Sequence, residues 1–515
     1  MKKPFFYQCL FMCTWIYSVI FNVADWDLWA RMAVGKMFFQ LGTVLKRDIF
    51  SYTPVKDIWI DHEWGSGVIF YFLSHHFGDL GLMMLKIIGT FIIIVLITKI
   101  VELQNIKPKT HLNLFFYILI LAATFHGVGI AVRCQLFTFI LFALWIYVLE
   151  LVRRGNNRLL WILPATMLIW TNLHGGFVSG IGLLLIYGTG EFLNKKSCKK
   201  YFLILIPTIL VTFINPYGVK YLSYIIHATT MPRPTIVEWK PTNLFGPTSQ
   251  WKGFKILFFL SLITLIFSFI KNKLNYKILD KVKYLLILIT AFLALKHIKH
   301  HTFFVIVAGS FLYHDFYAIF SFIRDFIVSK FGETADKILK YMALGKNIML
   351  YIIITFVSIV WMYYTPIKLR MPEDTYPLGS IEFVKQNNLK GNLLTVFHWG
   401  SYTIWKLCPQ CMIALDGRYE EVYPEDLHMM VYNFNYIIDK NWYDFIKKYH
   451  TDIIIVEKKN ESYSLMLNNK DWKNVYSDKI SAVFMPAGKA KKSYIIPKYT
   501  EEYIEKERYN TSIGF

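Results

Sequence analysis

Long apolar runs alternate with short polar connections through the first 365 residues of the chain. An apolar run of about 20 residues can cross a bilayer as a helix. Such runs predict about eleven transmembrane helices, at 5–24, 80–101, 112–126, 135–151, 159–172, 177–193, 201–215, 254–270, 284–295, 302–320 and 347–365. The run 65–77 is too short to cross, and it predicts a re-entrant or interfacial helix within a first outer loop at 25–79.

The pattern changes after Pro366, where short β-like runs replace the long apolar ones. These runs lie at 393–396, 412–415 and 452–456, with charged helical stretches between them. The sequence therefore predicts a polytopic α-helical membrane domain over 1–365 and a soluble α/β domain over 366–515.

Composition and charge agree with a membrane protein. Hydrophobic residues make up 55% of the chain and charged residues 18%, and the mean hydropathy is +0.38, which exceeds that of soluble enzymes. The net charge of +21 could suggest a nucleic-acid partner, but nearly all of the excess lies before Pro366, so we expect none. The basic residues occupy alternate loops, as the positive-inside rule requires: Lys2, Lys3, Lys107, Lys109, Arg153, Arg154, Arg158, Lys195, Lys196, Lys199, Lys200 and those within 271–283.

Assigning these basic loops to the cytoplasm places the 366–515 domain outside the cell. The N-terminal run is then an uncleaved first span. The same topology gathers most unusual polar residues at outer span ends: Asp25, Asp27, His62, Glu63, His126, Arg133, His174, Glu238, Lys296, His297, Lys299, His300 and His301. Ionisable groups are costly near hydrocarbon, so this gathering predicts a working cavity at the outer face.

Asp25 and Asp27 lie two residues apart just after the first span. Two such carboxylates can bind a divalent cation, or one of them can act as a general base. The alternative is a solvated helix cap with no chemical role.

The segment Asp25-Trp26-Asp27-Leu28-Trp29-Ala30-Arg31, followed by Gly35, Asp48-Ile49-Phe50-Ser51-Tyr52-Thr53 and His62-Glu63-Trp64, resembles the first outer loop of the GT-C glycosyltransferases. This superfamily includes protein O-mannosyltransferases, lipid A aminoarabinose transferases and oligosaccharyltransferase catalytic subunits. The resemblance implies an inverting transferase that uses a polyprenyl-phosphate-linked sugar at the outer face of a membrane. A bacterial inner membrane fits this resemblance. It also implies a catalytic acidic pair after the first span and a soluble outer C-terminal domain.

This resemblance assigns expected roles to the polar residues. We expect Asp25 to be the base, with Asp27 as the second member of the pair. We expect the donor phosphate to be held by Arg133, Lys296, Lys299, His297, His300 and His301. The expected pocket residues are Arg31, His62, Glu63, His126, His174 and Glu238. A divalent cation, Mg²⁺ or Mn²⁺, would rest on Asp25 and Asp27, but the second outer loop lacks the carboxylates of metal-dependent members, so the metal stays open.

The acceptor can be a glycan, a lipid or a protein. The segments 398–402 and 416–418 are loosely similar to the acceptor segment of oligosaccharyltransferases, whose Asp is missing here, so peptide recognition is not carried over. Cys408 and Cys411 could form a disulfide outside the cell. A membrane transporter and a non-catalytic envelope-assembly protein remain alternatives, although no internal repeat or mid-span carboxylate supports a transporter.

Overall fold

A computed structural model describes residues 3–104, 114–246, 251–271, 279–364, 367–511 and 513. The basic residues Lys2, Lys107 and Lys109, the 272–278 part of the predicted basic loop, and the span ends 112–113 and 365 lie outside the described residues. The chain forms two compact units. The first comprises Met1–Asn22, Met83–Asn215 and Thr230–Lys368, and the second comprises Val23–Leu82, Pro216–Thr229 and Leu369–Phe515.

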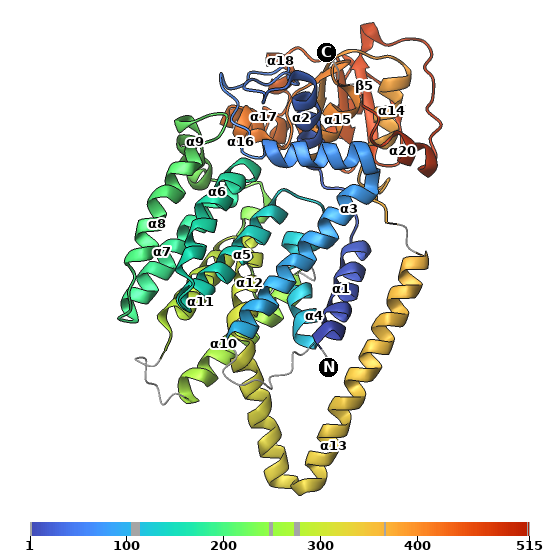
Figure 1. Cartoon of the computed structure of the whole chain (residues 1–515). Helices are drawn as coiled ribbons and strands as arrows, with labels where there is room; N and C mark the ends of the chain where they lie inside the picture. The colour runs from blue at the N-terminus through green and yellow to red at the C-terminus, as the bar shows by residue number, and fades with distance from the viewer. Residues whose placement is uncertain are drawn as a thin grey trace. The chain divides into compact units, whose positions relative to one another are not determined.

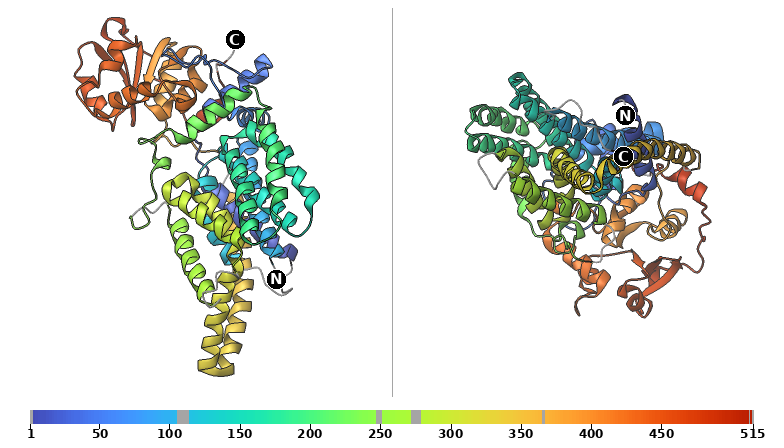
Figure 2. Two further views of the ribbon diagram at one scale, coloured as in Figure 1. Left: turned by 90° about the vertical axis from the view of Figure 1, so that its left-hand side faces the viewer. Right: turned by 90° about the horizontal axis from the view of Figure 1, so that it is seen from below.

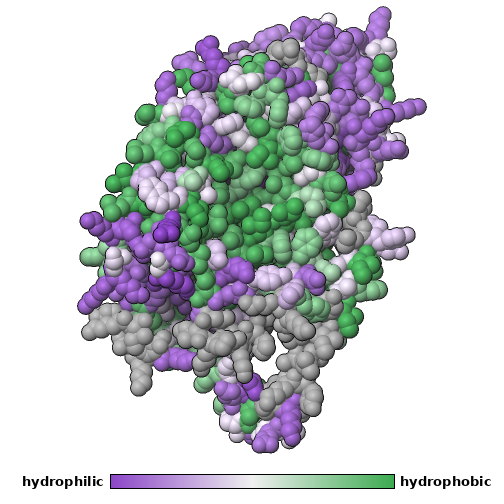
Figure 3. Space-filling model, in the orientation of Figure 1, coloured by the Kyte–Doolittle hydropathy of each residue, from purple (hydrophilic) through white to green (hydrophobic). Residues whose placement is uncertain are grey.

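The first unit is helical, and its helices fall on the predicted apolar runs. They are α1 (Lys3–Ile20), the part of α3 (Trp64–Leu103) after residue 82, α4 (Leu114–Ala123), α5 (Gln135–Arg153), α6 (Ile162–Leu173), α7 (Val178–Leu193), α8 (Lys199–Leu210), α10 (Lys252–Lys271), α11 (Lys281–Lys296), α12 (His301–Phe311) and α13 (Tyr313–Tyr364). Helices α5 to α8 run side by side in both Figure 1 and Figure 2. Apolar side chains cover the helices of this unit on the face shown in Figure 3.

Among the described residues, fewer helices than predicted have the length and hydropathy of a membrane span. Four described helices are long and apolar enough, namely Trp64–Leu103, Gln135–Arg153, Gly175–Leu193 and Lys252–Lys271. The pair Ile298–Phe311 and Tyr313–Thr334, bent by 58°, would make a fifth. The count of eleven is therefore not confirmed, because other predicted runs form shorter or interrupted helices. Helix α4, for example, has 10 residues before a π-helical turn at Phe125–Gly129.

Helix α3 is interrupted at Gly78, whose backbone has φ 56° and ψ −141°. A residue with a Cβ rarely adopts this conformation, so glycine at this position permits the break. The break falls where the sequence separates the short run 65–77 from the run 80–101. Helix α13 has a comparable break at Gly332, with φ 73°.

The second unit contains a five-stranded sheet in the order β2-β1-β3-β5-β4. The strands are β1 (Gly391–Thr395), β2 (Cys411–Ile413), β3 (Ile453–Glu457), β4 (Trp472–Ser477) and β5 (Ser481–Pro486). Strands β2, β1 and β3 pair in parallel, and β5 pairs antiparallel with β3 and β4. The three predicted β-like runs overlap β1, β2 and β3, whereas the sequence analysis did not predict the β4–β5 hairpin.

The helices of the second unit are α2 (Leu28–Leu41), the part of α3 up to residue 82, most of α9 (Val219–Thr230), α14 (Leu378–Gln386), α15 (Gly400–Leu407), α16 (Tyr419–Val422), α17 (Glu425–Tyr436), α18 (Asp444–Lys448), α19 (Glu461–Leu467) and α20 (Glu501–Glu507). Segments of the predicted first outer loop are part of this fold. Backbone hydrogen bonds join Ile413 of edge strand β2 to Phe50 (2.9 Å) and Tyr52 (3.1 Å). Helix α2 packs against α15.

Candidate functional site

The acidic turn formed by Asp25 and Asp27 lies in the second unit, directly before α2. Asp25 is 6% exposed, and its Oδ1 accepts a hydrogen bond from the backbone N–H of Asp27 (3.1 Å). Asp27 is exposed and is the N-cap residue of α2. The backbone N–H of Ala24 donates to the carbonyl oxygen of Arg370 (2.9 Å), so the turn is tied to the start of the C-terminal segment.

Aromatic side chains around Tyr376 hold this turn in place. The Trp26 ring stacks on the Tyr376 ring at a centroid distance of 4.1 Å. Trp29 Nε1 donates to the Tyr376 hydroxyl (3.0 Å), which in turn donates to the carbonyl oxygen of Ala24 (3.1 Å). Tyr376 is fully enclosed, with 1% of its surface exposed. The conformation of the acidic turn therefore depends on a residue that the sequence analysis did not select.

Two glycines of the C-terminal segment allow close packing at this turn. A Cβ on Gly417 would overlap Oδ1 of Asp27, so the Asp27 carboxylate lies directly over this glycine. A Cβ on Gly400 would overlap the carbonyl oxygen of Leu415. The His398 ring lies 4.9 Å from the Trp26 ring, centroid to centroid. The segments 398–402 and 416–418 thus meet the acidic turn, as a site that includes both would require.

A buried ion-pair group lies behind Gly417. Arg418, 1% exposed, donates from Nη1 to Asp48 and from Nε to Asp416, each at 2.8 Å. The Tyr423 hydroxyl donates to the other oxygen of Asp416 (3.1 Å). The guanidinium also lies 4.7 Å from the centre of the Trp59 ring. These contacts fix the 416–418 turn against the first loop.

Arg31 is the centre of a second buried group. Its Nη1 donates to Asp61 (2.7 Å), its Nη2 donates to Glu421 (2.7 Å), and its Nε lies 2.7 Å from Glu63. The Arg31 side chain is 6% exposed, and those of its three partners are between 1% and 11% exposed. Because three carboxylates surround it, Arg31 acts as a structural link between the first loop and the 419–422 helix.

His62 extends this group. Its Nδ1 lies 3.0 Å from Glu421 and its Nε2 lies 3.6 Å from Glu63. Burial alone would lower the pKa of His62, but Glu421 and Glu63 beside it raise the pKa to about 9. Burial would likewise raise the pKa of Glu421, but Arg31 and His62 hold it below its usual value. His62 is therefore protonated and Glu421 is ionised at neutral pH.

One group in the described part of the chain has the composition of a metal site, with three His, Cys, Asp or Glu residues whose ligand atoms all lie within 4.8 Å of one another. Its members are His62, Glu63 and Glu421. The arrangement fits a metal poorly. Glu421 already accepts hydrogen bonds from Arg31 and from Trp59 Nε1 (3.0 Å), and Arg31 supplies the positive charge that a metal ion would bring. Asp25 and Asp27 lie in one turn, and carboxylate oxygens are the ligands that Mg²⁺ prefers, so the expectation of a divalent cation stays with this pair.

The predicted phosphate-binding residues lie in the first unit, where several of them surround Trp239. Arg133 forms an ion pair with Glu238. Lys299 Nζ lies 3.3 Å from the centre of the Trp239 ring, and the Arg233 guanidinium lies 4.1 Å from it. Burial would raise the pKa of Glu238, but Arg133 lowers it, so one carboxylate stands among several cations. The sequence analysis did not select Arg233.

The three histidines of the 297–301 segment have two kinds of surroundings. His297 Nδ1 donates to the carbonyl oxygen of Trp239 (2.6 Å), and the His300 ring lies 5.6 Å from the His297 ring. His301 is buried, stacks on Phe254 at 3.6 Å and lies 2.7 Å from the Thr242 hydroxyl. His297 and His300 thus border the Trp239 group, whereas His301 packs inside the unit.

Three predicted residues have other surroundings. His174 Nδ1 accepts the backbone N–H of Gly176 (2.9 Å), so His174 caps a short helical turn. The His126 ring lies 6.4 Å from the His301 ring, and neither of its nitrogens has a hydrogen-bond partner among the described residues. Lys296 is exposed at the end of α11.

Comparison with solved structures identifies similar folds. A crystal structure of the Archaeoglobus fulgidus oligosaccharyltransferase in the apo form matches with a TM-score of 0.55 and 9% identity, covering 88% of this chain and 70% of that chain. A second structure of that enzyme, tethered via a disulfide bond to an acceptor peptide containing the NVT sequon, matches with a TM-score of 0.53 and 11% identity, covering 89% and 70%. No protein-family model and no curated protein matches the sequence. These matches show that the chain has a fold similar to that of this oligosaccharyltransferase, in line with the GT-C-like fold expected from the sequence, without assignment to a family.

Proposed function

We propose that this protein is an inverting membrane glycosyltransferase, which transfers a sugar from a polyprenyl-phosphate-linked donor to an acceptor at the outer face of the membrane. The observation that carries this proposal is the acidic turn at Asp25 and Asp27, built into a GT-C-like fold and packed against Gly417. The proposal keeps about eleven spans in the 1–365 domain, an extracytoplasmic 366–515 domain and a bacterial inner-membrane location.

Asp25 is the proposed general base. As the acceptor oxygen or nitrogen attacks the anomeric carbon, its proton passes to the Asp25 carboxylate, and the bond from that carbon to the donor phosphate breaks. Polyprenyl phosphate then departs with the bonding electrons from the opposite side, which inverts the configuration. The Asp27 N–H that donates to Asp25 Oδ1 orients this carboxylate.

The departing phosphate requires positive charge, and the group around Trp239 supplies it. Arg133, Lys299 and His297 lie there beside the single carboxylate of Glu238. A guanidinium can contact two phosphate oxygens at once, which makes Arg133 the principal candidate. A Mg²⁺ or Mn²⁺ ion held by Asp25 and Asp27 would supply further neutralisation of phosphate charge.

The test is sugar transfer by purified Asp25→Asn with a synthetic polyprenyl-phosphate-linked sugar. Loss of a general base lowers the rate by about 10²- to 10⁴-fold, whereas the melting temperature should change little because Asn has nearly the same volume. Asp57→Asn is the matched control, since Asp57 is an exposed carboxylate in the same loop. Near-normal transfer by Asp25→Asn would reject Asp25 as the base.

The acceptor and the orientation need separate measurements. Analysis of lipid-linked and surface glycans in a deletion strain would show which glycan, lipid or protein loses its sugar. Reporter fusions after Lys200 and after Lys368 should report opposite compartments. A cytoplasmic signal from the second fusion would overturn the proposed orientation.

A further inference from the structure

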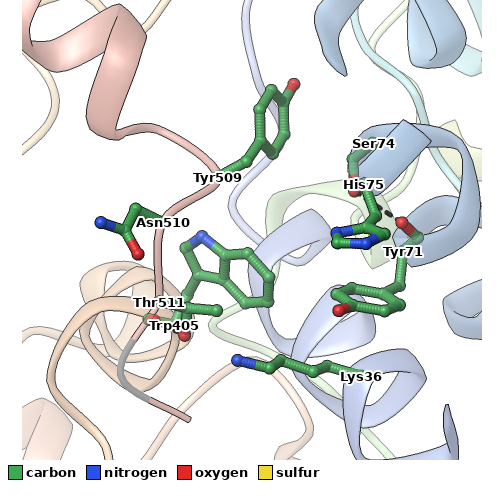
Figure 4. Close-up of a pocket in the computed structure, with 8 residues that line it drawn as sticks. All are labelled: Lys36, Tyr71, Ser74, His75, Trp405, Tyr509, Asn510 and Thr511. Atoms are coloured by element: carbon green, nitrogen blue, oxygen red, sulfur yellow. Dashed lines mark hydrogen bonds between the residues drawn. The ribbon is translucent and has the colours of Figure 1, made fainter. Parts of the chain in front are cut away.

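A cavity of about 200 Å³ lies within the second unit, and neither Asp25 nor Asp27 lines it. Figure 4 shows its lining, which comes from α2, the first part of α3, α15 and the C-terminal segment: Lys36, Tyr71, Ser74, His75, Trp405, Tyr509, Asn510 and Thr511. The Tyr71 and His75 rings are stacked with an interplanar angle of 16°. Trp405 meets Tyr71 edge-on at 6.4 Å.

Hydrogen bonds to backbone carbonyl oxygens hold several side chains of the cavity wall in place. Trp405 Nε1 donates to the carbonyl oxygen of Arg508 (2.9 Å), and the Thr511 hydroxyl donates to the carbonyl oxygen of Trp405. The Ser74 hydroxyl donates to the carbonyl oxygen of Tyr71 (3.0 Å). These side chains are thus already engaged with the backbone, which makes the wall a preformed surface.

Lys36 provides the charge of this cavity. In Figure 4 its side chain runs below the Tyr71 ring, with its nitrogen toward the Trp405 side of the cavity. None of the eight lining residues is acidic, and no ion pair of Lys36 is found among the described residues. Burial lowers the pKa of Lys36, with no carboxylate to oppose the shift. A bound anion would supply the negative charge that this partly buried ammonium lacks, and so would offset its lost hydration.

Exposed aromatic side chains continue from the cavity wall. The Phe39 ring lies 5.6 Å from the Tyr71 ring and stacks on the Phe72 ring at 6.4 Å. Phe39 is 51% exposed, Phe72 45% and Phe77 57%. Phe77 stands one residue before the break at Gly78, and the apolar run 80–101 follows it. Phe77 is thus three residues along the chain from a predicted membrane span, and aromatic side chains favour the lipid interface.

We propose that this cavity binds the phosphate headgroup of an anionic membrane phospholipid, with Lys36 on the phosphate and the acyl chains against Phe39 and Phe72. The volume is below the 300–1,000 Å³ typical of pockets that enclose a whole drug-sized ligand, so it suits a headgroup whose chains stay outside. A neutral sugar fits less well, because the lining offers no carboxylate to accept hydrogen bonds from its hydroxyls. The site is independent of the proposed transfer reaction.

The test is native mass spectrometry of the detergent-purified full chain, titrated with phosphatidylglycerol or phosphatidylcholine of the same acyl composition. The wild type should bind phosphatidylglycerol more tightly. Lys36→Gln should weaken that binding about tenfold, the loss of one charge-assisted contact, while Lys36→Arg should retain most of it. Lys46→Gln is the matched control, because Lys46 is an exposed lysine of the same unit.

Several outcomes would overturn the assignment. Equal affinity of the wild type for both lipids would remove the role of charge, and an unchanged affinity in Lys36→Gln would place the lipid elsewhere. Displacement of phosphatidylglycerol by millimolar inorganic phosphate would identify a soluble anion as the occupant.

Phe39→Ser separates the headgroup contact from the acyl-chain contact, because it should weaken the binding of both lipids alike. Asp25→Asn should bind phosphatidylglycerol normally, since Asp25 does not line this cavity.

Discussion

Replacing Arg31 by Met tests the most densely charged part of the second unit. The variant keeps much of the aliphatic volume but removes the guanidinium that contacts Asp61, Glu63 and Glu421. Three carboxylates would then be buried with only His62 nearby to balance them. Removing one partner from a buried ion pair costs about 3–5 kcal/mol, mainly because the remaining charge loses its compensation.

This cost can be converted into a melting temperature. A folding unit of about 150–250 residues shifts by about 2–4 °C per kcal/mol, so Arg31→Met should melt roughly 6–20 °C below the wild type. The measurement is thermal unfolding of the full chain in detergent at pH 7, followed by tryptophan fluorescence at a fixed scan rate. Trp59, one of the 15 tryptophans that contribute to this signal, lies beside the group, because its Nε1 donates to Glu421.

Arg47→Met is the control, because Arg47 is an exposed arginine of the same loop. Surface substitutions usually change stability by no more than about 0.5 kcal/mol. The double variant Arg31→Met with Glu421→Gln should recover part of the loss, since it removes one of the uncompensated charges. If Arg31→Met melts no lower than Arg47→Met, the reasoning that Arg31 compensates a buried acidic group is wrong.

Three further changes test other parts of the structure. The melting-temperature difference between wild type and His62→Gln should be largest below pH 6.5 and vanish above about pH 9, because the raised pKa makes the protonated form the stabilising one; a difference independent of pH would contradict this. Gly417→Ala should displace the Asp27 carboxylate and lower the transfer rate at least about tenfold, with little loss of stability. Gly488→Ala is its control and should keep full activity, because an added Cβ at Gly488 meets nothing within 4 Å. Arg133→Ala should weaken binding of a polyprenyl-phosphate analogue by on the order of 2 kcal/mol, and Arg133→Lys should recover only part of the lost affinity. Unchanged affinity in the alanine variant would reject the phosphate role of Arg133.

The sequence predicted those features of the fold that depend on local pattern. Each apolar run in the first unit contains a helix, although several helices are shorter than the run or interrupted, because a continuous run of apolar side chains favours a backbone that satisfies its own hydrogen bonds. The separation of 65–77 from the following run also has a local cause, the backbone freedom of Gly78. Short β-like runs similarly located three strands of the sheet.

Contacts between distant segments could not be predicted in this way. The backbone pairing of Tyr52 with Ile413 joins residues more than 300 positions apart, and no periodicity in either segment specifies its partner. Arg31 was expected to line the pocket, because it belongs to the first-loop segment that resembles the GT-C pattern. Its partner Glu421 is one of several acidic residues in a charged stretch, and the sequence offers no signal that selects it.

The acidic turn depends on the C-terminal segment as much as on its own loop. Ala24 pairs with Arg370, Tyr376 anchors the peptide before Asp25, and Gly417 leaves space for the Asp27 carboxylate. Each contact joins a residue of the first loop to one that follows Leu369, so the two segments fold as one compact unit. Preorganisation of a general base requires that its neighbours be fixed before substrate arrives. The C-terminal segment is therefore a structural part of the proposed catalytic turn, and substitutions at Tyr376 or Gly417 bear on catalysis as directly as those in the first loop.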